Sequence, residues 1–196
     1  MCGRYIANSE DEIVEIREIL KQISMRFLSA EIERNAALSD IFPTDKVMII
    51  NSSAEITKAK WGIEKWDKKG VIINAKSETF EQSKFFSPFA KNRCVVPAHG
   101  YYEWRTVQDK KKVKYVFMNE NNRAIFMAGI LKPSFQKGEQ GELAIITRPA
   151  AEEILFIHPR MPLIIKAEQI GQWLSGAISV RELKKQSPGI LWKEAV

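Results

Sequence analysis

Apolar residues near the start of the chain recur at the spacing of an amphipathic helix. Between positions 10 and 22 they return every three to four residues, as at Ile13 and Ile16. Ser9 followed by Glu12 forms a capping box, which marks a helix N-terminus. We therefore expect a helix over 10–22.

Beyond this helix, short apolar runs bounded by polar or turn residues predict strands. The expected strands are 46–51, 55–61, 71–73, 93–97, 101–105, 112–118, 123–131 and 143–147. Gly100 predicts a bend between the fourth and fifth of these, and the polar residues 119–122 suggest that 112–118 and 123–131 form a hairpin. Further helices are expected at 150–157, with Pro149 in the favourable first turn, and at 168–174.

The balance of these elements predicts the fold class. Strands outnumber helices and do not alternate with them one to one, which favours an α+β fold with a largely antiparallel sheet over a doubly wound fold. The 196 residues suit one domain, and the 45% hydrophobic content is that of an ordinary globular protein.

Charge and cysteine content narrow the possible partners. A net charge of +6 fits a nucleic-acid partner but also fits many proteins that bind none. No apolar run approaches the roughly 18 residues of a membrane helix, and no signal peptide is evident, so we expect a cytoplasmic protein. The two cysteines and two histidines lack zinc-ligand spacing, so we expect reduced thiols, no metal and no cofactor. Nothing suggests coiled-coil assembly, and we expect a monomer.

The second residue carries distinctive chemistry. If Met1 is removed, Cys2 bears a free α-amine with a pKa of about 7.7–8.0 and a thiol with a pKa of about 8.5. Such an aminothiol can trap an aldehyde, because the amine forms an imine and the thiolate then closes a thiazolidine ring. Taken alone, however, a cysteine near a terminus is more often an ordinary small residue.

Three other segments combine polar residues with strand or turn signals. They are 74–79 at the end of an expected strand, 93–104 with Glu103 among aromatic residues, and 157–162 with His158 and Arg160 beside prolines. Each has an ordinary explanation: Glu103 as a surface strand residue, His158 at a helix C-terminus, Arg160 in a surface ion pair. Together with Cys2, they offer a thiol, an amide, a carboxylate and an imidazole.

These segments in this order resemble the SRAP family of abasic-site processing proteins, also described as SOS response-associated peptidases. The family's motifs correspond here to Cys2-Gly3-Arg4, Pro43-Thr44, Trp61-Gly62, 74–79, 93–104 and 158–162. The resemblance implies a single SRAP domain over 1–196 with a barrel-like β core flanked by a few helices. It also implies that the C-terminal segment, from about 176 to 196, is shorter than usual for the family.

The resemblance implies that the chain captures abasic sites in single-stranded DNA as a covalent thiazolidine adduct on Cys2, which shields the lesion in the DNA damage response. Cys2, Asn74, Glu103 and His158 then form the catalytic set. Glu103 is expected to shuttle protons, His158 to move protons at the sugar oxygen, and Asn74 to hold the sugar or the Cys2 amine. Lyase-type chemistry and autoproteolytic removal of Met1 are also implied.

The resemblance places DNA contacts on a second set of residues. Arg4, Lys76 and Arg160 are expected to bind phosphates, and Trp66 and Phe42 to stack on bases. Pro43 and Thr147 complete the expected DNA-binding set, with Thr147 beside the DNA backbone.

Three features depart from the family pattern. Lys76 stands where an arginine is usual, which keeps the charge but loses the bidentate fork. His99 stands where a small or acidic residue is common, near Glu103 in sequence. The usual basic final segment is not recognised after Trp192, so either a strand or part of the DNA groove is lost or the chain is a compact variant.

Two other functions stay open at this stage. A thiol peptidase could use Cys2 with His158 as its base, if only to remove Met1, although such an enzyme does not need its nucleophile at the N-terminus. A non-covalent single-stranded DNA binder would also suit the basic charge.

Overall fold

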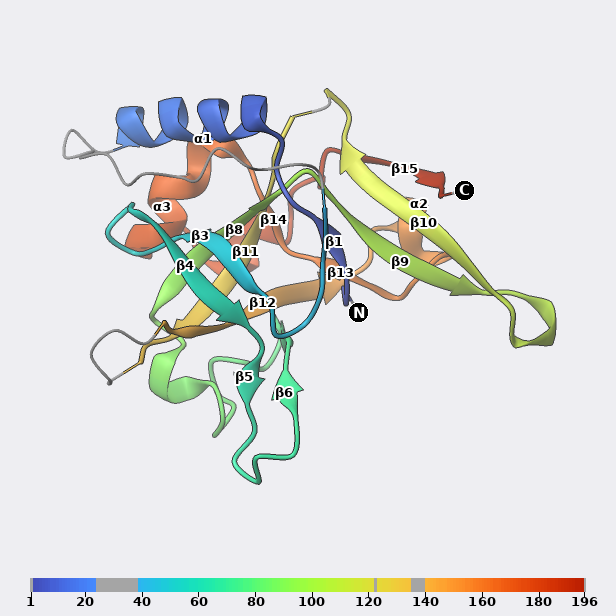
Figure 1. Cartoon of the computed structure of the whole chain (residues 1–196), viewed down its shortest axis with the longest axis horizontal. Coiled ribbons are helices and arrows are strands. Elements are labelled where there is room, and N and C mark those ends of the chain that lie inside the picture. The colour runs from blue at the N-terminus through green and yellow to red at the C-terminus, as the bar shows by residue number, and fades with distance from the viewer. Residues whose placement is uncertain (1, 24–38, 122, 135–139, 196) are drawn as a thin grey trace.

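The N-terminal helix α1 (Glu10–Ile23) lies along one side of a body built of strands (Figure 1). The computed structural model describes residues 2–23, 39–121, 123–134 and 140–195. The helix predicted over 10–22 is confirmed, with Ile16 and Leu20 fully buried against the core. Its capping box is also present, since the amide of Ser9 donates to the Glu12 carboxylate at 2.8 Å.

Five strands close into a small barrel at the centre of the molecule. They are β3 (Lys46–Ile50), β4 (Ile56–Trp61), β8 (Arg93–Ala98), β11 (Ile125–Lys132) and β12 (Glu142–Pro149). The ring runs β12-β4-β3-β8-β11, and the pairing of β11 with β12 closes it. Most pairs are antiparallel as expected, but β12 runs parallel to β4 and to β7 (Asn74–Lys76). The fold is therefore α+β, a single domain with a small mixed barrel.

A second sheet packs beside the barrel in the order β15-β10-β9-β1-β2. Its strands are β1 (Tyr5–Ile6), β2 (Asp40–Ile41), β9 (Gly100–Thr106), β10 (Lys112–Asn119) and β15 (Ile190–Glu194). The bend expected near Gly100 is confirmed, because His99 separates β8 in the barrel from β9 in this sheet. A Cβ on Gly100 would lie 2.5 Å from the carbonyl oxygen of Phe117, so a side chain here would force β9 away from β10.

The hairpin expected between 112–118 and 123–131 is wrong. β10 pairs with β9 and β15, whereas β11 pairs with β8, β12 and β14 (Ile164–Ile165) in the barrel. The connection, of which Asn122 lies outside the described residues, carries the chain from one sheet to the other. Local turn residues signal a reversal but not which strands fill the neighbouring edges.

The helix expected at 150–157 is shorter than its pattern suggested. Pro149 ends β12 and lies opposite Arg160 of β13 (Arg160–Pro162) rather than opening a helix. Helix α2 covers only Glu152–Leu155. Because proline lacks an amide hydrogen, the end of a strand suits it as well as the first turn of a helix does.

The remaining helices and strands do not belong to the ring of barrel strands. β5 (Ile63–Glu64) and β6 (Val71–Ile72) form a hairpin that projects from the body (Figure 1). The helix expected at 168–174 is present as a 3-10 turn followed by α3 (Ile170–Ser175). The C-terminal segment adds α4 (Val180–Leu183) and β15, which fills the edge of β10. No helix of the described ranges has the length and apolar character to cross a membrane.

Candidate active site around Cys2

Cys2 lies fully buried just before β1, in the same apolar cluster as Tyr5, Trp61 and Tyr101. The N-terminal segment is fixed against β9, since the amide of Tyr102 donates to the carbonyl oxygen of Arg4 at 3.0 Å. The Cys2 thiol lies 3.8 Å from that same carbonyl oxygen. Burial, and after it the charge of Glu103, raises the pKa of the thiol. The resting site therefore holds a neutral thiol.

Asn74 connects the barrel to Cys2. Its Nδ2 donates to the Cys2 carbonyl oxygen at 2.9 Å, and its side chain is buried. The Oδ1 atom of Asn74 is buried without a hydrogen-bond partner among the described residues. A buried acceptor left free in this way is available to a ligand.

Glu103 comes from β9 of the second sheet, and His158 from the connection between α2 and β13. Glu103 Oε1 and His158 Nδ1 lie 3.9 Å apart, and the Glu103 side chain is almost fully buried. Burial raises the pKa of Glu103 to about 7 and lowers the pKa of His158, because burial disfavours the charged form of each. His158 Nδ1 also lies 3.0 Å from both the carbonyl oxygen and the amide nitrogen of Arg160, which fixes the imidazole ring.

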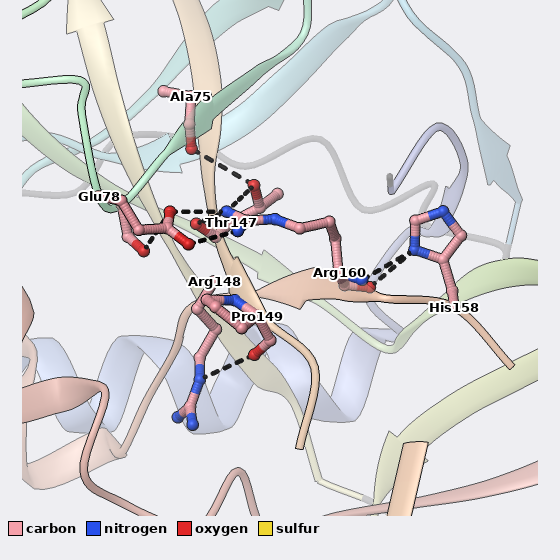
Figure 2. Close-up of polar contacts among 8 residues, drawn as sticks. Ala75, Glu78, Thr147, Arg148, Pro149, His158 and Arg160 are labelled. Atoms are coloured by element: carbon pink, nitrogen blue, oxygen red, sulfur yellow. Dashed lines mark hydrogen bonds and ion pairs between the residues drawn. The ribbon is translucent and has the colours of Figure 1, made fainter. Parts of the chain in front are cut away.

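Arg160 is held in place by two neighbours (Figure 2). Its guanidinium forms a two-pronged ion pair with Glu78 and donates to the Thr147 carbonyl oxygen at 2.7 Å and to the Thr147 hydroxyl at 3.1 Å. The hydrogen bond from Arg160 lowers the pKa of Glu78 to about 2. The positive charge of Arg160 is thus already balanced in the free protein.

Strand β12 explains why distant segments meet here. One edge of β12 pairs with β7, which places Ile145 opposite Asn74 and Thr147 opposite Lys76. Its other edge pairs with β13, which places Pro149 opposite Arg160. The segments 74–79 and 157–162 therefore share one strand as their common support.

The residues expected to bind DNA occupy different environments. Arg4 stacks its guanidinium 4.5 Å from the Phe42 ring centre and 5.2 Å from the Trp104 ring centre, and lies 3.5 Å from the Asp40 carboxylate. Lys76 is exposed and Pro43 is partly exposed. Thr147 has no exposed surface and contacts Arg160 and Ala75, so its contact with DNA stays a prediction.

Trp66 is 75% exposed at the tip of the β5–β6 hairpin. Its ring centre lies 5.3 Å from that of Phe85, which belongs to a cluster with Phe86 and Phe89. The Trp66 ring is therefore supported from behind yet largely open to solvent.

Two features of the site escaped sequence reasoning. Glu78 lies within the segment 74–79, but only the fold reveals that it holds Arg160. His99, next to the motif of Glu103 in sequence, contacts a different carboxylate: its Nδ1 lies 3.1 Å from Glu12 of helix α1. Among the residues that the structure describes, no group of three or more histidine, cysteine, aspartate or glutamate side chains could hold a metal ion.

Comparisons with known proteins place this chain in a known family. The family model described as "SOS response associated peptidase (SRAP)" matches residues 1–190, and the chain belongs to this family. It is 28% identical over 195 residues to the abasic site processing protein YedK of Escherichia coli K12, covering 93% of this chain and 83% of YedK. It is 30% identical over 187 residues to the abasic site processing protein YoqW of Bacillus subtilis, covering 89% and 80%.

Solved structures share the fold. A phage-related protein of Bordetella bronchiseptica superposes with a TM-score of 0.75 at 20% identity, covering 99% of this chain and 94% of that one. A protein of Bacteroides thetaiotaomicron gives a TM-score of 0.73 at 22% identity, covering 98% and 91%.

Proposed function

We propose that this chain captures abasic sites in single-stranded DNA by forming a thiazolidine between Cys2 and the ring-opened deoxyribose. The observation that carries the proposal is the convergence of four groups on one buried site: the Cys2 thiol, the Asn74 amide, the Glu103 carboxyl and the His158 imidazole. The names of the relatives YedK and YoqW, abasic site processing proteins, support the choice of lesion.

The chemistry requires removal of Met1, because the nitrogen of Cys2 is otherwise an amide nitrogen that cannot form an imine. The freed amine adds to the aldehyde carbon of the open-chain sugar, and the aldehyde oxygen leaves as water to give the imine. The sulfur then adds to the imine carbon, and its proton ends on the nitrogen of the closed ring. One water is released for each adduct, and no oxidant or metal is consumed.

Glu103 and His158 supply the proton transfers. A carboxyl with a pKa of about 7 is partly protonated at neutral pH, so Glu103 can give a proton to the departing oxygen and take one from the amine. His158, with a lowered pKa, stays neutral and can accept a proton when the closed sugar opens. Asn74 holds the Cys2 carbonyl and offers its free Oδ1 to the sugar.

The surrounding residues suit a single strand. Arg4 and Lys76 offer positive charge to phosphates, and Trp66 offers an exposed ring on which a base can stack. Arg160 can reach a phosphate if it shares its guanidinium with Glu78, and Thr147 would act by holding Arg160.

A peptidase role is favoured only for the chain's own first bond. Burial raises the pKa of the Cys2 thiol, and a mostly protonated thiol is a poor nucleophile for a peptide carbonyl, which is far less electrophilic than an imine carbon. The Met1–Cys2 bond, however, adjoins Cys2, and its hydrolysis by one water would release free methionine and leave the amine on Cys2. We include autoproteolytic removal of Met1 in the proposal, and the intact mass of wild type and of Glu103→Gln tests it.

The main experiment uses an oligonucleotide with one abasic site. We expect a protein–DNA band that survives denaturation with wild type and is absent with Cys2→Ala, while reversible binding in the native gel persists. A tetrahydrofuran analogue, which has no aldehyde, should bind but give no such band. A denaturant-sensitive shift with the true abasic site would favour plain binding, and an undiminished adduct with Cys2→Ala would remove Cys2 from the mechanism.

A further inference from the structure

The hydroxyl group of Tyr101 is buried without a visible role in the resting fold. The side chain is fully buried on β9, and its hydroxyl has no hydrogen-bond partner among the described residues. Its ring stacks on Phe117 of β10 with centres 4.7 Å apart and planes 6° apart. A phenylalanine would keep this stacking without burying an unpaired polar group, so the hydroxyl adds nothing visible to the resting fold.

The hydroxyl belongs to the surroundings of Cys2. Tyr101 and Glu103 are alternate residues of β9, so their side chains emerge on the same face of the sheet. Strand β1 pairs with β9 through Tyr5 and Tyr101, which brings the N-terminal segment alongside this face. Cys2 and Tyr101 are both members of the apolar cluster formed there.

The causes of the raised pKa of Tyr101 agree with a position of its hydroxyl near Cys2 and Glu103. Burial comes first among the causes that raise its pKa, and the charges of Cys2 and Glu103 follow. The phenol therefore keeps its proton at neutral pH and can serve as a hydrogen-bond donor. Its neighbours of possible negative charge are the two groups that the proposed chemistry uses.

In the resting state, the surroundings of the Cys2 sulfur do not stabilise a thiolate. The contact that the thiol makes with the described residues is with the carbonyl oxygen of Arg4, an acceptor, which favours the protonated form over the thiolate. Burial acts in the same direction. A thiolate at this fully buried position therefore needs a hydrogen-bond donor from the protein.

We propose that the Tyr101 hydroxyl donates a hydrogen bond to the Cys2 sulfur as the thiol ionises, and so promotes ring closure. This inference rests on the proposed function, because only ring closure gives the thiolate a role. The proton of the thiol passes to a base of the site, and the Tyr101 proton stays on its oxygen. The hydroxyl is unpaired at rest because its partner is the ionised sulfur.

The test compares Tyr101→Phe with Tyr102→Phe, which removes a hydroxyl from the next residue on the opposite face of β9. The rate at which methyl methanethiosulfonate modifies Cys2 is followed against pH by mass spectrometry of the Cys2 peptide, so that Cys94 does not interfere. We expect Tyr101→Phe to lower this rate roughly tenfold at each pH where the thiol is mostly protonated, because the thiolate fraction there falls with the pKa shift. Tyr102→Phe should leave the rate unchanged.

Thermal unfolding separates this role from a structural one. The melting temperature of Tyr101→Phe should equal or exceed that of wild type, because an unpaired buried hydroxyl is lost. An unchanged modification rate, with or without a lower melting temperature, would overturn the inference. If the rate falls as expected but wild type forms no adduct with abasic DNA, the hydrogen bond is supported and the proposed function fails.

Discussion

At the scale of single residues, one physical cause shifts Glu103 and His158 in opposite directions. Burial disfavours the charged form of each, which raises the pKa of the carboxyl to about 7 and lowers that of the imidazole. Near neutral pH the carboxyl is therefore about half protonated and the imidazole mostly neutral, with the two groups 3.9 Å apart. Because the imidazole is mostly neutral, the two groups can exchange protons with a substrate without first breaking an ion pair between them, as acid–base chemistry at neutral pH requires.

The raised pKa of Glu103 predicts how stability depends on pH. Between about pH 4.5 and 7 the folded state keeps a proton on Glu103 that the unfolded state releases, so this stabilisation is complete below the unfolded pKa and is lost as pH rises through about 7. Glu103→Gln cannot ionise. Relative to wild type, the variant should therefore gain about 2 kcal/mol in unfolding free energy from pH 5 to pH 8.

Denaturant unfolding of both proteins at pH 5 and pH 8 measures this difference, and all other titrating groups cancel in the comparison. A difference between variant and wild type that is the same at both pH values would mean that Glu103 is ionised with its ordinary pKa in the folded protein.

At the scale of elements, the hairpin of β5 and β6 projects from the barrel (Figure 1). Trp66 lies in the turn between the two strands. The Trp66 ring packs on Phe85 and is 75% exposed. A large apolar ring exposed to water is unfavourable, and a ligand that covers the ring removes this unfavourable contact. Trp66→Ala should weaken binding to single-stranded DNA by about 1–3 kcal/mol, the usual value of one base stacked on an aromatic ring.

Fluorescence anisotropy with a labelled single strand measures that loss. Trp66→Phe is the matched control and should retain most of the affinity, because it keeps an aromatic face over Phe85. Equal affinities for wild type and Trp66→Ala would mean that the hairpin does not touch the strand.

Some of the helices and strands could be predicted from the sequence, and others could not. The apolar spacing of α1 and the runs of β3, β4, β8 and β12 are local signals, and each element formed where expected. The partners of β10 were not predictable from its turn, because β15 comes from the far end of the chain. Pro149 was misread because proline satisfies both a helix start and a strand end.

At the scale of the whole molecule, the barrel and the second sheet bring together residues that the sequence separates widely. The resemblance to the SRAP family selected Cys2, Asn74, Glu103 and His158 as candidates, but the sequence did not reveal why they meet. These residues meet because β12 pairs with both β7 and β13, and because β9 pairs with β1. Glu78 pairs with Arg160, and Tyr101 is buried in the same cluster as Cys2, and both facts follow only from the assembled fold.

Affinity for DNA could come from the net positive charge of the whole molecule or from single basic residues that contact phosphates. The net charge is +6, and Lys76 is exposed at the end of β7, two strands from Arg160. For single strands, each phosphate contact contributes about 0.7 to the slope of log affinity against log salt. Lys76→Gln should reduce the magnitude of that slope by about 0.7 and weaken binding at low salt.

Lys21→Gln removes the same charge from the end of helix α1, where Lys21 pairs with Glu18, and the helix lies on the other side of the body from the β5–β6 hairpin (Figure 1). This control should leave the salt slope unchanged, because counterions are released only where phosphates are contacted. Anisotropy titrations over a series of salt concentrations measure both slopes. If the two variants reduce the slope equally, the attraction is a property of the total charge, and Lys76 has no special place on the DNA path.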